Sequence, residues 1–243
     1  MNPGIYRRCI RIATSEQEAR ADMEDDLHRY AVIIRHDGTC VTAIEGLPVR
    51  VPWSLCPQSV KALDRLIGMP LSPHPLAVFR HTDGSRQCTH MFDLAGLAIA
   101  HATRGIPKRQ YDIEAPYLKE KGARSLSLRR DGREILNWAI DGATLQTPEA
   151  FAGRDIRHLP AWAESAFPDP DDFEAIVILR RSVLISKARL HDWDSFPTAA
   201  ATGHGLGACY VFQPGMQERA TRMLGTAREF TDALERMLLD IKP

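Results

Sequence analysis

The chain has 243 residues, of which 44% are hydrophobic, so it can bury a core without disulfides or structural metals. Its 31 basic and 31 acidic side chains cancel to a formal net charge of zero. Nucleic-acid-binding proteins normally carry a basic excess, so we expect no nucleic-acid partner. No apolar run is as long as a membrane span, and the N-terminus lacks the apolar segment of a signal peptide. These features predict a cytoplasmic protein with no membrane partner.

The cysteines are odd in number and widely spaced: Cys9, Cys40, Cys56, Cys88 and Cys209. The sequence contains no C-x-x-C motif. A disulfide framework or a zinc ribbon normally shows an even number of cysteines or close pairs. We therefore expect reduced thiols.

The first 51 residues predict an antiparallel meander. Hydrophobic residues alternate in part over 5–12, and 30–35 is a compact β-prone run. Asp37-Gly38 is a tight-turn signal, after which 41–51 returns as the next strand. Two helices are expected beyond the prolines that follow, over 59–67 and 87–103. The second ends near Gly105 and Pro107, because these residue types stop helices.

A second set of elements follows in a similar order. Residues 109–115, 125–130 and 134–140 predict strands, and 171–188 predicts a helix with acidic residues at its start. The two sets are either degenerate strand-strand-strand-helix-helix repeats or unrelated hairpins. In the tail, 198–207 predicts a loop and 208–212 a short strand. Two helical stretches are expected after it, the last docking through Leu234, Leu238 and Ile241.

Together these elements predict a single domain over 1–243 of the α+β class, with antiparallel sheets and packed helices. If the duplication is real, its halves are 1–105 and 106–243. The sequence leaves the oligomeric state open, a homo-oligomer included.

Polar and titratable side chains concentrate in residues 80–93, a loop followed by the first turns of the second helix. On a wheel of 100° per residue, several of them fall in a stripe about 80° wide. Its members are Arg86, His90, Asp93, Leu97, His101 and Arg104. The stripe is either the solvated face of an otherwise apolar helix or the lining of a cavity.

If the stripe lines a cavity, His90 and Asp93 are three residues apart and can act as a base with its orienting carboxylate. The preceding loop adds a second pair of the same kind, His81 and Asp83. We expect the catalytic residues among these four.

Cys88, His90 and Asp93, with Cys56 and His101 further away, are of metal-ligand types. None of them follows the spacing of a closed site, so we expect no metal. Cys88 is either a nucleophile or a small buried hydrophobic residue, and no acyl-transfer signature surrounds it. No dinucleotide-binding, phosphate-loop or nucleophile-elbow motif occurs, so we expect no cofactor.

Aromatic and basic residues at strand ends or near turns are candidates for binding a substrate. They are Tyr6, Arg7, Trp53, Phe79, Arg80 and Tyr111. Each of them, taken singly, is equally compatible with a structural role.

Five segments, at 2–8, 24–28, 56–57, 87–94 and 207–215, together resemble a bacterial family catalogued as domain of unknown function 2889. The segment Cys88-Thr89-His90 is the most specific part of a resemblance that covers most of the chain. The resemblance implies a role in the catabolism of lignin-derived aromatic dimers. In that role, similar proteins would release formaldehyde from a hydroxymethyl side chain.

Two classes of function remain. The first, which rests on the resemblance, is a cofactor-independent carbon–carbon lyase that acts on a small aromatic compound and releases formaldehyde to leave a stilbene. The second is a non-catalytic small-molecule-binding or assembly module. The lyase needs residues 80–93 to line a cavity, whereas a module leaves them exposed and shows an apolar patch elsewhere.

Overall fold

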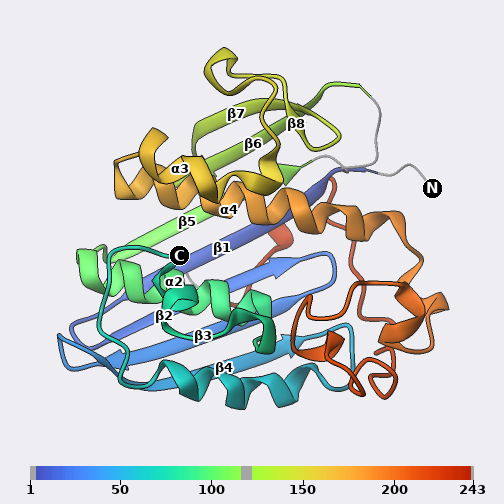
Figure 1. Cartoon of the computed structure of the whole chain (residues 1–243), viewed down its shortest axis with the longest axis horizontal. Coiled ribbons are helices and arrows are strands. Elements are labelled where there is room, and N and C mark those ends of the chain that lie inside the picture. Colours follow the sequence, from blue (N-terminus) through green and yellow to red (C-terminus); the bar gives the residue numbers. More distant parts are fainter. Residues whose placement is uncertain (1–3, 116–121, 242–243) are drawn as a thin grey trace. The chain divides into compact units, whose positions relative to one another are not determined.

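The computed structural model describes residues 4–115 and 122–241 and confirms the predicted α+β class. Its strands are β1 (Tyr6–Thr14), β2 (Glu18–Asp25), β3 (Arg29–His36), β4 (Val41–Arg50), β5 (Lys108–Ala115), β6 (Arg124–Arg130), β7 (Arg133–Asp141) and β8 (Thr144–Leu145). Its α-helices are α1 (Ala77–His81), α2 (Thr89–Arg104), α3 (Pro160–Ala166) and α4 (Pro170–Ser186). The strands form an antiparallel sheet in the order β4-β3-β2-β1-β5-β6-β7-β8 (Figure 1).

The chain divides into two compact units. The β2–β4 unit comprises Ile10–Arg109 and Asp192–Arg228, and the β6–β8 unit comprises Met1–Cys9, Gln110–His191 and Glu229–Lys242. A single domain with halves 1–105 and 106–243 stays a prediction. The order of elements does not establish a duplication.

In the β2–β4 unit, α2 packs against β2 and β3, as Figure 1 shows. Strand β2 contributes alternate residues to the core, since Ala19, Ala21 and Met23 are all buried. The partner strand is in register, with Met23 opposite Tyr30. Burial of these apolar faces is the main stabilising contribution that such a layered arrangement offers.

Helix α2 begins after Cys88 and ends at Gly105, whose φ of 65° places it in the left-handed region. This ending agrees with the sequence prediction. Midway along the helix, Gly96 faces the backbone of Pro75, and a Cβ on Gly96 would lie 2.1 Å from the Pro75 carbonyl oxygen. Because Gly96 has no side chain, the backbone at Pro75 can lie directly against α2.

The structure corrects several local predictions. The expected helix over 59–67 is a 3-10 helix, η1 (Cys56–Leu66), and β2 was not predicted. The strand expected over 208–212 is wrong, because this segment contains the 3-10 helix η8 (Tyr210–Phe212). The loop expected over 198–207 includes a short 3-10 helix, η7 (Ala199–Thr202).

The tail also differs from its prediction. Two helical stretches were expected after residue 212, whereas the described part of that tail contains one 3-10 helix, η9 (Leu234–Arg236). The expected docking is nevertheless confirmed. Leu238 is buried in a cluster with Cys9, Phe230 and Met237, and Leu234 and Ile241 pack against it.

Among residues 4–115 and 122–241, no helix has the length and apolar character needed to cross a membrane.

The contact at Gly96 is testable. Gly96→Ala should lower the free energy of unfolding by about 1 to 3 kcal/mol, because the new methyl group overlaps a backbone atom. Urea-induced unfolding measures this loss. Gly205→Ala is the control, since that position has open space and no positive φ. Equal stability of the two variants would show that α2 does not approach Pro75 this closely.

Candidate functional site

The turn between β2 and β3 places a carboxylate beside an imidazole. Asp25 Oδ1 accepts hydrogen bonds from the backbone N–H groups of Leu27 (3.0 Å) and His28 (2.8 Å), and it lies 3.0 Å from His28 Nδ1. The Asp25 side chain is 1% exposed and that of His28 is 12% exposed. A carboxylate on Nδ1 orients the ring and leaves Nε2 as the atom that can exchange a proton with a ligand.

Arg50, at the end of β4, holds this turn from the other side. Its guanidinium donates to the backbone oxygens of Asp25 (2.6 Å), Asp26 (3.0 Å) and His28 (3.3 Å). It also pairs with the Glu24 carboxylate at 3.1 Å, and both side chains are largely buried. The Arg50 guanidinium therefore pairs with one buried carboxylate of this turn and joins three of its carbonyl groups.

A second imidazole stacks on the first. The rings of His28 and His90 have centroids 4.0 Å apart and planes inclined by 30°, and His90 lies in the first turn of α2. The ring of Tyr30 stacks beside both. One potential ligand atom from each of Asp25, His28 and His90 lies within 4.8 Å of the others. We call these three residues the acid–base cluster.

Buried thiols adjoin the cluster through Tyr30. Burial raises the pKa of the Tyr30 hydroxyl well above its usual value, and the nearby thiols of Cys88 and Cys56, both hydrogen-bonded to it, raise it further. Burial likewise raises the pKa of the Cys88 thiol from 9.0 to about 11. A thiol that keeps its proton at neutral pH is a poor nucleophile. The sequence left two roles open for Cys88, and this raised pKa favours a small buried hydrophobic residue over a nucleophile.

The stripe on α2 is not a solvated face. Leu97 and His101 are buried and His90 and Asp93 are half-buried, so that interpretation is wrong for these members. His90 instead faces the turn between β2 and β3. The carboxylate gathered with it in the cluster is Asp25. The pair of His90 with Asp93 stays a prediction.

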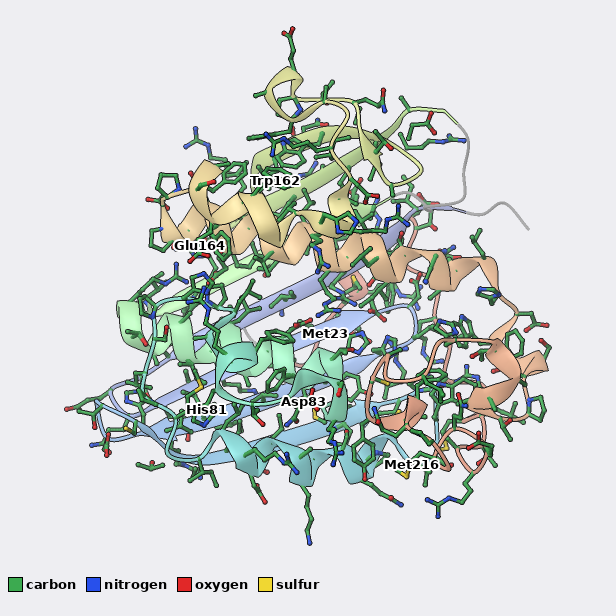
Figure 2. All side chains as sticks on the ribbon, viewed as in Figure 1. Met23, His81, Asp83, Trp162, Glu164 and Met216 are labelled. Atoms are coloured by element: carbon green, nitrogen blue, oxygen red, sulfur yellow. The ribbon has the colours of Figure 1, made fainter. Side chains whose placement is uncertain are left out.

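The second predicted pair, His81 and Asp83, is exposed in the segment before α2 (Figure 2). Asp83 Oδ1 accepts from the Ser85 backbone at 2.9 Å and caps the 3-10 helix η2 (Gly84–Arg86). Hydrogen bonds from Ser85 lower the pKa of the Asp83 carboxyl. A capping carboxylate of this kind is suited to remaining ionised rather than to exchanging protons.

The predicted substrate-binding residues are divided between the two units. Phe79 and Arg80 are exposed on α1, and the Phe79 ring meets Phe92 edge-on at 4.8 Å. Trp53 is buried with its edge against Trp193.

The other three belong to the β6–β8 unit, where they make structural contacts. Tyr6 accepts a hydrogen bond from Arg8 Nε at 2.9 Å. Arg7 pairs with Glu114 and donates to the Thr231 carbonyl. The fully buried Tyr111 hydroxyl donates to Glu174 at 2.6 Å.

Asp25 and His28 were missed as candidates, although the segment 24–28 formed part of the family resemblance. The available signal was a run of three acidic residues that ends two positions before a histidine. Such a run normally indicates a solvated turn, because acidic side chains are rarely buried. Here Arg50 pairs with Glu24, and backbone N–H groups and the His28 ring hold Asp25.

Two imidazoles and a carboxylate meet in this cluster, a set of ligand types that sequence spacing did not single out. Their geometry nevertheless favours an acid–base arrangement over a metal centre. The lone pairs of an imidazole lie in its ring plane, and zinc binds nitrogen at about 2.0–2.1 Å. Two rings stacked at 4.0 Å with planes 30° apart hold their lone pairs in two separate planes, which disfavours one ion bound by both rings.

The fold and site thus define an antiparallel α+β protein whose β2–β4 unit carries a buried carboxylate–imidazole pair with a second imidazole. Residues 10–104, which lie within this unit, form a domain of the family described as protein of unknown function (DUF2889). The match includes all three residues of the acid–base cluster. A search of curated proteins gave no match.

We expect the purified protein to contain no stoichiometric transition metal, because the stacking disfavours one ion bound by both rings. Elemental analysis of protein prepared without chelators measures this. One zinc or iron per chain, lost in both His28→Ala and His90→Ala, would contradict the acid–base arrangement.

The buried thiols predict a loss of stability in alkali. Between pH 9 and about 11 the unfolded Cys88 thiol releases its proton whereas the folded one retains it. The free energy of unfolding should therefore fall as pH rises through this window, by at most a few kcal/mol from this group. Urea unfolding at pH 8 to 11 measures the fall. It should be shallower in Cys88→Ala than in the control Cys40→Ala, and equal slopes would contradict the assignment.

Proposed function

We propose that the β2–β4 unit is a cofactor-independent carbon–carbon lyase that acts on a small aromatic compound. The observation that carries this proposal is the acid–base cluster, in which Asp25 orients His28 and His90 stacks on it. An oriented imidazole beside a second imidazole supplies the base and the acid that a proton-coupled bond cleavage needs.

The proposed substrate is a phenolic dimer with a CH₂OH group next to a benzylic carbon that carries an ether or hydroxyl oxygen. The phenolate expels this oxygen, which takes a proton from His90, and a quinone methide forms. His28 then removes the hydroxymethyl proton through Nε2. The carbon–carbon bond breaks, formaldehyde leaves, and its electron pair restores the phenolate and forms the stilbene double bond.

These reaction steps balance without an external oxidant or reductant. One proton leaves His90 and one arrives at His28, and exchange of both imidazoles with solvent restores the starting state. The quinone methide is the electron sink that an organic cofactor would otherwise supply.

Three observations support this proposal over a purely structural role for the cluster. Asp25 is almost fully buried and engaged with backbone, so the ring it orients is held in place. The His28 side chain retains some exposure. The cluster lies inside residues 10–104, the part of the chain that matches the family to which the lyase resemblance refers. The alternative, a non-catalytic binding module, predicts binding without turnover.

Incubation of the protein with a phenylcoumaran or a diarylpropane diol, assayed for formaldehyde and for stilbene absorbance, tests the reaction. We expect turnover by the native protein and a loss on the order of 10²- to 10⁴-fold in His28→Ala and in His90→Ala. His81→Ala is the matched control, because that histidine is exposed and outside the cluster.

The experiment tests the proposed reaction and the proposed site separately. No formaldehyde from either scaffold would reject the lyase and favour the binding module. Full turnover in both His28→Ala and His90→Ala, with each variant folded by circular dichroism, would reject the cluster as its site.

A further inference from the structure

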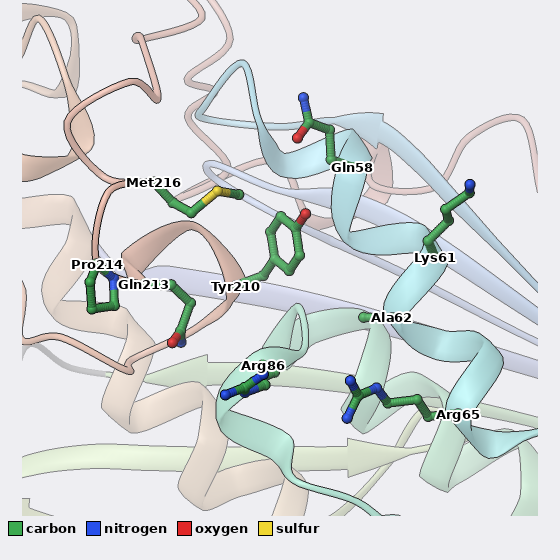
Figure 3. A pocket seen from close by; sticks show the side chains of 9 residues that line it. All are labelled: Gln58, Lys61, Ala62, Arg65, Arg86, Tyr210, Gln213, Pro214 and Met216. Atoms are coloured by element: carbon green, nitrogen blue, oxygen red, sulfur yellow. The ribbon is translucent and has the colours of Figure 1, made fainter.

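A pocket of about 530 Å³ in the β2–β4 unit lies outside the acid–base cluster. We call it the basic pocket, and it is lined by Gln58, Lys61, Ala62, Arg65, Arg86, Tyr210, Gln213, Pro214 and Met216 (Figure 3). This volume is within the usual range for small-molecule sites. The lining includes three cations and no carboxylate, which is unusual in a chain whose charges cancel overall.

Hydrogen bonds join three segments of the chain around the pocket. Gln87 Nε2 donates to the Ala62 carbonyl on η1 at 2.8 Å, and the Tyr210 N–H donates to the Gln87 carbonyl at 2.9 Å. Gln213 Nε2 donates to the Ser85 carbonyl at 2.7 Å. The walls formed by η1, η2 and η8 are therefore held in position before any ligand arrives.

The cations of the basic pocket are under-compensated. Over the described residues, Lys61 and Arg65 form no ion pair, and Arg86 has a single exposed partner, Asp83, at 3.9 Å. Two other arginines of this unit are more closely paired: Arg20 lies 2.7 Å from Asp22 and Arg222 lies 3.0 Å from Asp194. Guanidinium groups that line one pocket without a close ion pair are a typical site for a carboxylate.

Figure 3 shows the Arg65 side chain extending toward the loop that carries Arg86, whereas Lys61 extends away from both. An anion would therefore lie between the two arginines. On the other side of the pocket, the Tyr210 ring, Pro214 and Met216 form an apolar and aromatic wall. Such a wall favours a flat ring over an aliphatic chain.

We propose that the basic pocket binds an aromatic carboxylic acid, with its carboxylate between Arg65 and Arg86 and its ring against Tyr210. This inference goes beyond the lyase, since a protein without turnover can still bind such a ligand. Asp83 is the competing carboxylate, because Arg86 and Arg65 both interact with it electrostatically. Its removal should strengthen binding.

Calorimetric titration with 4-hydroxybenzoate and stilbene-4-carboxylate, each beside its neutral carboxamide, tests the proposal in the full chain. We expect at least one acid to bind and its carboxamide to bind at least tenfold more weakly, because a charge-assisted contact is lost. Arg65→Gln and Arg86→Gln should each weaken binding roughly tenfold or more. Acetate tests whether the ring contributes.

Two further variants serve as controls. Asp83→Asn keeps an oxygen for the Ser85 cap but removes the charge, so it should tighten binding severalfold at low salt. Arg133→Gln, an exposed arginine of the β6–β8 unit, should leave binding unchanged. Absence of binding by both acids, equal binding of acid and carboxamide, or equal binding of acetate would overturn the proposal. Equal affinity of Arg65→Gln, Arg86→Gln and the native protein would do so too.

Discussion

The candidate site depends on the guanidinium of Arg50. Five groups converge on it around one acidic turn: the Glu24 carboxylate and the backbone oxygens of Asp25, Asp26, His28 and Thr226. Without this cation the buried Glu24 carboxylate would lose an ion pair, which is costly in the interior, and the carbonyl groups of the turn would lose a shared donor. From the same turn, Asp25 orients the His28 ring of the cluster.

The polar residues beneath α2 have different roles, which depend on the turn that Arg50 holds. Asp25 and His28 are set by the turn, and His90 is delivered by the first turn of the helix that covers it. Tyr30 stacks on both imidazoles and is hydrogen-bonded to the thiols of Cys56 and Cys88, whose pKa values burial raises. These thiols therefore keep their protons at neutral pH.

Periodicity predicted the elements whose apolar residues recur without interruption. The strands around Tyr30 and Val41 and the helix ending at Gly105 were all expected within a few residues. Strand β2 was not predicted, because its charged residues Arg20, Asp22 and Glu24 alternate with Ala19, Ala21 and Met23. Small apolar residues between charges give a weak strand signal. The segment 208–212 was expected as a strand from its β-prone residues, whereas hydrogen bonds to Gln87 and Gly207 hold it in a turn.

The sequence by itself determined the class of fold and the helix that carries His90, because these rest on local spacing. It could not show which distant residues surround His90. Helical spacing pointed to Asp93, and the adjacent loop offered His81 and Asp83, whereas the rings of His28 and Tyr30 that stack on His90 lie about sixty positions earlier. Only the pairing of β2 with β3 and the packing of α2 across them brought these rings to His90. Burial of charge and ring stacking depend on contacts between distant segments, which no local pattern records.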